Sequence, residues 1–157
     1  MPPITRPSHS LRSRYFNPFR LASYLLILFT IGHTLGAVIA TPRFGSGSDA
    51  VVSAMKTVHV TAQSADCTWY GFYRGFGAMI SIYFVFSIVL TWHLGGLSAR
   101  DRRALAPVTW ALFATYVGNA VIGWVYFFPT PQIFSTIIAV LLGLGCMNRQ
   151  QQERANE

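Results

Sequence analysis

The sequence has few charged residues and very few acidic ones. Charged residues make up 11% of the 157 positions and hydrophobic residues 52%, whereas a soluble domain usually has about 25% charged residues. So few charges could hardly cover a water-exposed surface, and the composition therefore excludes an ordinary soluble domain. None of the 5 Asp and Glu residues lies within a long apolar run, which disfavours a proton-driven carrier and a carboxylate-based terpene cyclase.

The sequence also lacks the residue patterns that bind metals or phosphates. There is no Cys/His spacing typical of a zinc site, no paired-carboxylate site, no Ser-His-Asp set and no glycine-rich loop following a strand. We therefore expect neither a metal nor a cofactor. The topology below puts the two cysteines, Cys67 and Cys146, on opposite sides of a membrane, which excludes a disulfide between them. Cys67 is then a free thiol without a role or an intermolecular bridge.

Four apolar runs are each long enough to cross a bilayer as a helix. About twenty helical residues span about 30 Å, the thickness of the hydrocarbon core. The sequence therefore predicts an all-α fold, a four-transmembrane-helix bundle in residues 21–147, between a basic segment 1–20 and a polar tail 148–157. The predicted spans are residues 21–41, 72–97, 105–128 and 132–147.

The first apolar run has an alternative interpretation as a secretory signal peptide, because Val38-Ile-Ala40 resembles a cleavage site. However, the run exceeds the usual signal-peptide length of about 7–15 apolar residues, and further apolar runs follow it. We therefore expect it to be retained as a transmembrane helix.

Positive charge is unevenly distributed between the two sides of the predicted bundle. Nine of the 12 Lys and Arg residues lie in segment 1–20, in the turn 98–103 or in the tail; the other three are Arg43, Lys56 and Arg74. The positive-inside rule then predicts that both termini lie in the cytoplasm. The membrane would be a bacterial inner membrane or an endoplasmic reticulum membrane. Because the basic residues flank the membrane and the aromatic residues lie inside the apolar runs, the net charge of +7 does not indicate a nucleic-acid partner.

The longest polar segment, residues 42–70, joins the first two spans on the external side. Its apolar residues recur at helical spacing, with polar residues opposite them, which predicts a short amphipathic helix on the membrane surface. A connection of this length is often a lid or a binding loop. The apolar stripe consists of Val51, Met55, Val58 and Ala62.

Polar residues inside three of the spans fall at a similar depth. With a rise of about 1.5 Å per residue, His33 lies about 18 Å from the start of the first span and Asn119 about 21 Å from the start of the third. Tyr83, on the antiparallel second span, reaches a comparable level. We therefore expect an internal pocket, with polar residues at its outer mouth. Its lining would be His33, Thr34, Tyr83, Tyr116 and Asn119, and its mouth Tyr73, Arg74 and Tyr126.

Each of these polar residues also has a structural interpretation. Tyr, Thr and Asn side chains between transmembrane helices often stabilise packing, by about 0.6 kcal/mol per contact, and His33 could hydrogen-bond to Asn119. His33 is still the strongest catalytic candidate, because a titratable ring at this depth is rare and can move a proton near neutral pH. Arg74 either extends to the headgroups or binds an anionic oxygen. The glycine pairs Gly32/Gly36 and Gly71/Gly75 predict close helix packing.

Two motifs resemble a known family. Gly32-His-Thr-Leu-Gly36 and Phe72-Tyr-Arg-Gly-Phe-Gly77 are similar to motifs of small four-helix membrane proteins from bacteria and fungi, DoxX-like in architecture. The similarity covers residues 30–97 and implies the four-helix fold, but no particular reaction. The chain departs from the family pattern at Tyr70 and Gly71, where the family has Trp and Asp, so a mechanism that needs a carboxylate beside His33 is disfavoured.

Two classes of function fit this arrangement. The protein could be a membrane-embedded enzyme acting on a lipophilic small molecule, as an isomerase, a cyclase or a cofactor-free oxygenase of secondary-metabolite biosynthesis. His33 would then be the general acid or base, and Asn119, Tyr83 and Tyr116 would donate hydrogen bonds to a developing oxyanion. Alternatively, it is a non-catalytic accessory or scaffold subunit, with a second copy or another membrane protein as partner, or a lipid-binding module.

Overall fold

The computed structural model describes residues 17–41 and 45–154. The elements follow one another as a long helix that ends in a π-helical turn, a short helix, a β-hairpin, and then a series of further helices. Their bounds are α1 Pro18–His33, η2 Thr34–Ile39, α2 Ser46–Thr57, β1 His59–Ala62, β2 Ala65–Thr68, α3 Trp69–Gly96, α4 Ala99–Ala104, α5 Ala106–Tyr126 and α6 Pro129–Arg154.

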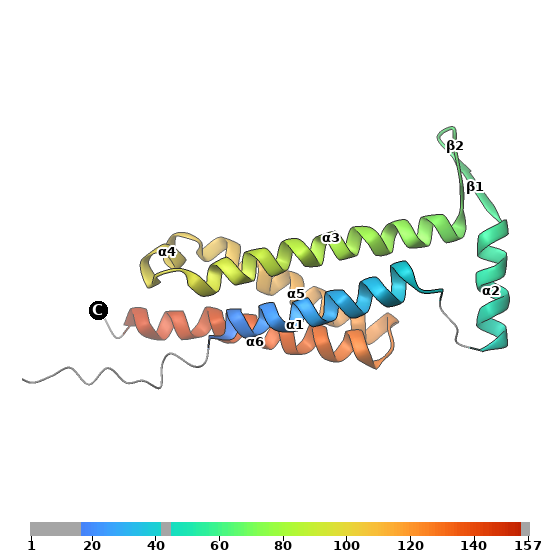
Figure 1. Ribbon diagram of the computed structural model, residues 1–157. Coiled ribbons are helices and arrows are strands. Elements are labelled where there is room, and N and C mark those ends of the chain that lie inside the picture. Colours follow the sequence, from blue (N-terminus) through green and yellow to red (C-terminus); the bar gives the residue numbers. More distant parts are fainter. Residues whose placement is uncertain (1–16, 42–44, 155–157) are drawn as a thin grey trace, which may run out of the picture.

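Four of these helices are long and apolar enough to cross a membrane, and the predicted all-α, four-transmembrane-helix fold is confirmed. The four candidate spans are Pro18–Ile39, Trp69–Gly96, Ala106–Tyr126 and Pro129–Met147. The four long helices run side by side, while α2 lies crosswise at one end with the hairpin beyond it (Figure 1). Helix α1 packs against both α3 and α6, and α5 packs against α6.

The two ends of the bundle differ in what they carry (Figure 1). One end, called here the hairpin end, holds η2, α2, the β-hairpin, and the starts of α3 and α6. The opposite end, called the α4 end, holds the start of α1 and the short helix α4, which joins α3 to α5. The side chains considered below are located by these two ends.

Local sequence signals explain where several helices begin. The Asn17 side chain caps α1 by accepting from the Arg20 backbone N–H (3.3 Å), and Pro18 occupies the first turn. Thr68 caps α3 in the same way through Gly71 (3.0 Å). Helix α6 begins at Pro129, three residues before the predicted start at 132. Proline is tolerated there because backbone N–H groups in the first turn of a helix have no partner within the helix.

The connection between the first two spans differs from its prediction. The expected helix is present as α2, but it ends at Thr57, and Val58 is already extended (φ −83°, ψ 125°). Ala62, predicted on the helical stripe, lies at the end of β1, which pairs antiparallel with β2. Gln63 and Ser64 form the turn with positive φ values of 50° and 66°, the geometry of a two-residue hairpin turn. Neither residue is the usual Gly or Asn, so the turn carried no clear sequence signal.

The outer surface of the bundle requires a lipid environment. Large apolar side chains are widely exposed, for example Met79 at 65% and Ile82 at 70%, whereas Leu26, Ile138 and Leu142 are fully buried between helices. Exposed tryptophans lie at both ends, which is typical of the aromatic belts of membrane proteins. They are Trp69 and Trp124 towards the hairpin end, and Trp92 and Trp110 towards the α4 end. The chain is therefore a multi-pass integral membrane protein.

The glycines that permit close packing are not the predicted pairs. A Cβ atom at Gly145 would lie 2.6 Å from Phe19 Cζ, and one at Gly143 would lie 2.9 Å from Phe113 Cε2. By contrast, a Cβ atom at Gly32, Gly36 or Gly75 would have no neighbour within 4 Å among the described residues. Close approach therefore depends on other glycines: Gly143 and Gly145 on α6, where aromatic rings from α5 and α1 approach the helix backbone, and Gly77 on α3, which Val38 approaches.

Candidate functional site

The contact between α1 and α3, called here the α1–α3 seam, pairs most of its polar groups. At the α4 end, Asn17 Nδ2 donates to the Gly95 carbonyl (2.7 Å). Further along, Ser23 Oγ donates to Thr91 Oγ1 (2.8 Å). At the hairpin end, Thr34 Oγ1 and Ser81 Oγ lie 2.9 Å apart, and the Ser81 hydroxyl donates to the Gly77 carbonyl.

His33 belongs to this seam. Its Nε2 lies 3.2 Å from the Gly77 carbonyl oxygen. Because a carbonyl can only accept, Nε2 carries the hydrogen, and the neutral ring keeps its lone pair on Nδ1. The half-buried ring also meets Phe84 edge to face, with centroids 5.4 Å apart. His33 therefore stabilises helix packing through Nε2, while Nδ1 has no hydrogen-bond partner among the described residues.

The π-helical turn η2 begins directly after His33. Its widened geometry is seen in the bond from the Ala40 N–H to the Leu35 carbonyl, five residues back (2.8 Å). Turns of this kind occur frequently at functional sites. Here the turn brings Ala37 and Val38 against Gly77, where a Cβ atom would lie 3.3 Å from Val38 Cγ2. No sequence pattern predicted this turn.

Tyr83 on α3 and Tyr116 on α5 form the second polar contact inside the bundle, called here the tyrosine pair. Their rings are nearly parallel (23°), with centroids 6.3 Å apart, and Tyr116 has no exposed surface. Both hydroxyl oxygens are buried, and neither finds a hydrogen-bond partner in the described part of the chain. The Ser87 and Tyr83 hydroxyls both lie near that of Tyr116, but neither meets hydrogen-bonding geometry with it. Both rings of the tyrosine pair therefore carry a buried hydroxyl that has no hydrogen-bond partner among the described residues.

An unpaired hydroxyl in this position is costly. Leaving a buried donor or acceptor without a partner costs about 1–3 kcal/mol, and the hydrocarbon core supplies no water to compensate. Phenylalanine would fill the same volume without this cost at either position. Helix packing therefore does not explain why tyrosine, and not phenylalanine, occupies these two positions.

Aromatic rings surround these residues. Phe84 contacts both His33 (5.4 Å between centroids) and Tyr83 (5.8 Å). On its other side it contacts Phe29, which stacks on Phe134 (5.1 Å, 13°). Phe84 therefore links the α1–α3 seam to the tyrosine pair, and the region between them is apolar and aromatic.

The structure divides the predicted pocket lining between two places. His33 and Thr34 lie in the α1–α3 seam, and Tyr83 and Tyr116 form the tyrosine pair. Asn119 lies one turn beyond Tyr116 on α5 and is half-buried. Its side-chain amide has no hydrogen bond to any described residue. The hydrogen bond considered between His33 and Asn119 is therefore not formed, because His33 bonds to α3 instead.

The predicted mouth residues lie at the hairpin end, but not together. Tyr126 is the last residue of α5 and is 78% exposed. Tyr73 stacks on Tyr70 (6.5 Å between centroids). The Arg74 guanidinium lies over the Tyr70 ring, with Cζ 5.9 Å from the ring centroid, and Lys56 Nζ lies 5.1 Å from the same centroid. Sequence reasoning missed Tyr70 and the approach of Lys56, although Tyr70 and Arg74 are four residues apart on one helix face.

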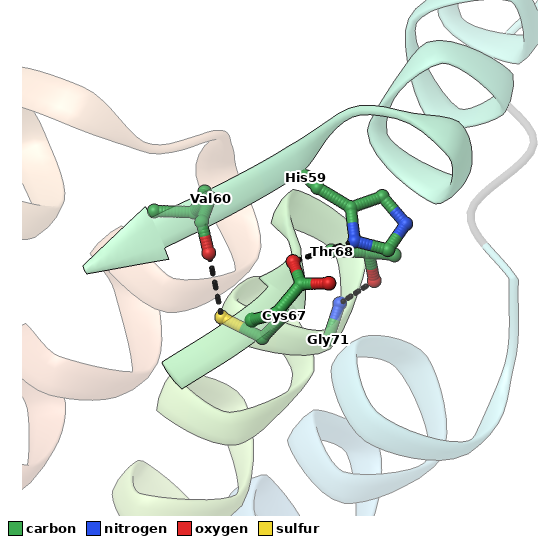
Figure 2. A network of polar contacts seen from close by, with 6 residues as sticks. His59, Val60, Cys67, Thr68 and Gly71 are labelled. Atoms are coloured by element: carbon green, nitrogen blue, oxygen red, sulfur yellow. Dashed lines mark hydrogen bonds and ion pairs between the residues drawn. The ribbon is translucent and has the colours of Figure 1, made fainter. Parts of the chain in front are cut away.

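The β-hairpin, which directly precedes α3, is held by its own polar contacts (Figure 2). His59 Nδ1 and Asp66 Oδ1 form an exposed ion pair at 2.7 Å. The Cys67 thiol donates to the Val60 carbonyl (3.9 Å) across the two strands and is not in a disulfide. Cys146 is buried on α6 and is not in a disulfide, and its Sγ donates to the Thr109 carbonyl (3.8 Å).

The α4 end carries an interfacial cluster and no candidate site. The Arg20 guanidinium lies over the Trp92 ring, 3.8 Å from its centroid, and Tyr24 meets the same ring edge to face. His93 is exposed, with Nδ1 2.9 Å from the Val89 carbonyl oxygen, far along α3 from the residues that contact His33. Within residues 17–41 and 45–154, no three His, Cys, Asp or Glu side chains converge on a metal position.

No protein-family model, curated protein or solved structure matches this chain. The resemblance of the two motifs, Gly32–Gly36 and Phe72–Gly77, to a known family therefore stays a prediction. In the structure the two motifs are in contact, because His33 of the first donates to the carbonyl of Gly77 in the second. The absence of a side chain at Gly77 lets η2 approach α3 closely.

Proposed function

We propose that this membrane protein binds a lipophilic small molecule with an oxygen-bearing head group, held at the tyrosine pair. The observation that carries the proposal is the pair of buried hydroxyls on Tyr83 and Tyr116 without protein partners. A ligand oxygen would supply the missing hydrogen bonds and remove the cost of leaving them unmade. The Phe84 ring, which contacts Tyr83, and the Phe29 ring packed on Phe84 suit an apolar or planar ligand body.

The chemistry of the two phenols restricts the head group. Each hydroxyl donates one hydrogen bond and accepts others, so a carbonyl, hydroxyl or carboxyl oxygen can pair with both. A pure hydrocarbon cannot pair with either. The proposal therefore predicts selectivity for oxygenated lipids over hydrocarbons of the same length.

The test measures ligand-induced thermal stabilisation of the purified full-length protein in a neutral detergent. The probes are 2-undecanone, farnesol and oleic acid, with undecane as the hydrocarbon of the same length as 2-undecanone. We expect saturable stabilisation by at least one oxygenated probe and none by undecane. The double variant Tyr83→Phe/Tyr116→Phe keeps both rings and should lose this stabilisation. Tyr24→Phe, at an exposed tyrosine on α1, is the matched control. Equal stabilisation of the double variant would refute the proposal.

A second candidate function is proton transfer catalysed by His33, as an isomerase, a cyclase or a cofactor-free oxygenase would require. The bond from Nε2 to Gly77 fixes the tautomer that leaves Nδ1 as a base, and Phe84 contacts both His33 and Tyr83. Nδ1 would remove a proton from a carbon next to a carbonyl, and the phenols would donate to the enolate oxygen.

Isotope exchange distinguishes catalysis from binding. The protein is incubated in D₂O with 2-undecanone, and deuterium uptake beside the carbonyl is measured by mass spectrometry. Catalysis predicts uptake that His33→Ala abolishes and that Thr34→Val, which removes a neighbouring seam contact but no base, retains. Equal uptake by the wild type and His33→Ala would leave binding alone as the function.

A further inference from the structure

Two cations at the hairpin end converge on one aromatic ring. Lys56, in the last turn of α2, places Nζ 5.1 Å from the centroid of the Tyr70 ring. Arg74, one turn further along α3 than Tyr70, places Cζ 5.9 Å from the same centroid. Both distances are within the range of cation–π attraction, about 6 Å. The three residues, called here the cationic cluster, join two elements that are separate in the sequence.

No acidic side chain balances these charges. Among the described side chains, neither Lys56 nor Arg74 forms an ion pair with an acidic residue, and Asp66 is already engaged with His59. Asp49 lies two turns before Lys56 on α2 and makes no ion pair with it. Two like charges beside one ring repel each other, and an anion shared between them would turn this repulsion into attraction.

The position of the cluster indicates where the anion comes from. Arg74 is five residues, or about 7.5 Å, from the start of the membrane-spanning helix α3. Trp69 and Tyr73 are exposed on the same part of the helix, and exposed Trp and Tyr side chains of membrane proteins are enriched at headgroup depth. The positive end of the α3 dipole lies in the same place. Headgroup phosphates are therefore the anions nearest to the cluster.

We propose that the cationic cluster of Lys56, Tyr70 and Arg74 binds a phosphate group, supplied by the headgroup of an anionic phospholipid. Arg74 and Lys56 bind the phosphate oxygens from α3 and α2, and Tyr70 holds both cations in position. The bound lipid fixes α2 across the hairpin end of the bundle. This site lies outside the tyrosine pair and does not depend on the function proposed for it.

The test titrates the purified full-length protein, in a neutral detergent, with dioleoyl phosphatidylglycerol and follows thermal unfolding. Phosphatidylcholine is the comparison lipid, and inorganic phosphate tests a soluble source of the same group. We expect saturable stabilisation by phosphatidylglycerol. Lys56→Gln and Arg74→Gln should each weaken the apparent affinity about fivefold, and together about 25-fold, as expected for loss of about 1 kcal/mol per cation near an anionic surface.

Arg100→Gln is the matched control, because it removes one exposed positive charge at the α4 end. It should change the affinity less than twofold. Equal weakening by Arg100→Gln, or unchanged affinity in the double variant, would show unspecific charge attraction and overturn the proposal, as would the absence of saturable binding to either phosphate probe. Stabilisation by inorganic phosphate at the same affinity would support the phosphate site and assign it a soluble ligand. Tyr116→Phe should bind phosphatidylglycerol normally, which separates this test from that of the tyrosine pair.

Discussion

Helix α3 makes two polar contacts inside the bundle, and they differ in whether their hydrogen bonds are completed. Towards α1, the hydroxyls of Ser23 and Thr34 and the Nε2 of His33 all have partners on α3. Towards α5, Tyr83 and Tyr116 stack ring on ring while both hydroxyls stay unpaired. Polar residues of the first kind stabilise packing, whereas those of the second lower stability unless something binds to them.

The largest effect should come from disrupting the α1–α3 seam at its closest approach. Gly77→Leu places a side chain where Val38 and Ala37 already contact α3, so η2 must move away and the His33 and Thr34 bonds are lost. We expect a loss of about 3 kcal/mol of unfolding free energy, measured by denaturant titration in micelles. Gly75→Leu, where a Cβ atom has open space, should cost much less. Similar losses for both variants would show that the seam is not closely packed at Gly77.

Removing a hydroxyl of the tyrosine pair should instead raise the free energy of unfolding. Tyr116→Phe deletes a buried oxygen that has no partner, so the ligand-free protein should become more stable by about 1–2 kcal/mol. The same denaturant titration measures this, and Tyr24→Phe, at an exposed position, should leave stability unchanged. A clear loss of stability in Tyr116→Phe would mean that the hydroxyl is paired within the protein.

A double-mutant cycle compares the two contacts directly. Ser23→Ala and Thr91→Val remove the two ends of one seam hydrogen bond (2.8 Å), and we expect a coupling energy of about 0.6 kcal/mol. In the corresponding cycle of Tyr83→Phe and Tyr116→Phe, no hydrogen bond joins the two hydroxyls, so their coupling should be smaller. Equal coupling in the two cycles would remove the distinction between the contacts.

The smallest effect is expected outside the bundle. Asp66→Asn breaks the ion pair with His59. The side chain of His59 is 55% exposed and that of Asp66 is 64% exposed, so water screens the pair. The bundle should lose less than about 0.5 kcal/mol of stability, while protease cleavage at the hairpin should become faster. A loss comparable to that of Gly77→Leu would show that the hairpin supports the bundle.

The fold was predictable from the sequence to a greater extent than the site. Four apolar runs indicate four spans because the hydrocarbon core tolerates few other structures. Helices α1 and α6 nevertheless begin at Pro18 and Pro129, each three residues before the predicted start. Tyr83, Tyr116 and His33 lie inside the bundle, and the functional roles expected of them stay predictions. Their distribution between two contacts was not predictable, and neither was the position of Lys56 beside Tyr70.

Composition and residue order by themselves determined that this chain enters a membrane and roughly where it crosses, because burial in lipid requires long, uninterrupted apolar helices. Only the tertiary structure decided which polar groups are paired. In a membrane helix, the lipid-facing and helix-facing sides are both apolar, so periodicity does not encode helix rotation. The rotation and register of α3 between α1 and α5 give His33 a partner in Gly77, 44 residues away, and leave the hydroxyls of the tyrosine pair without one.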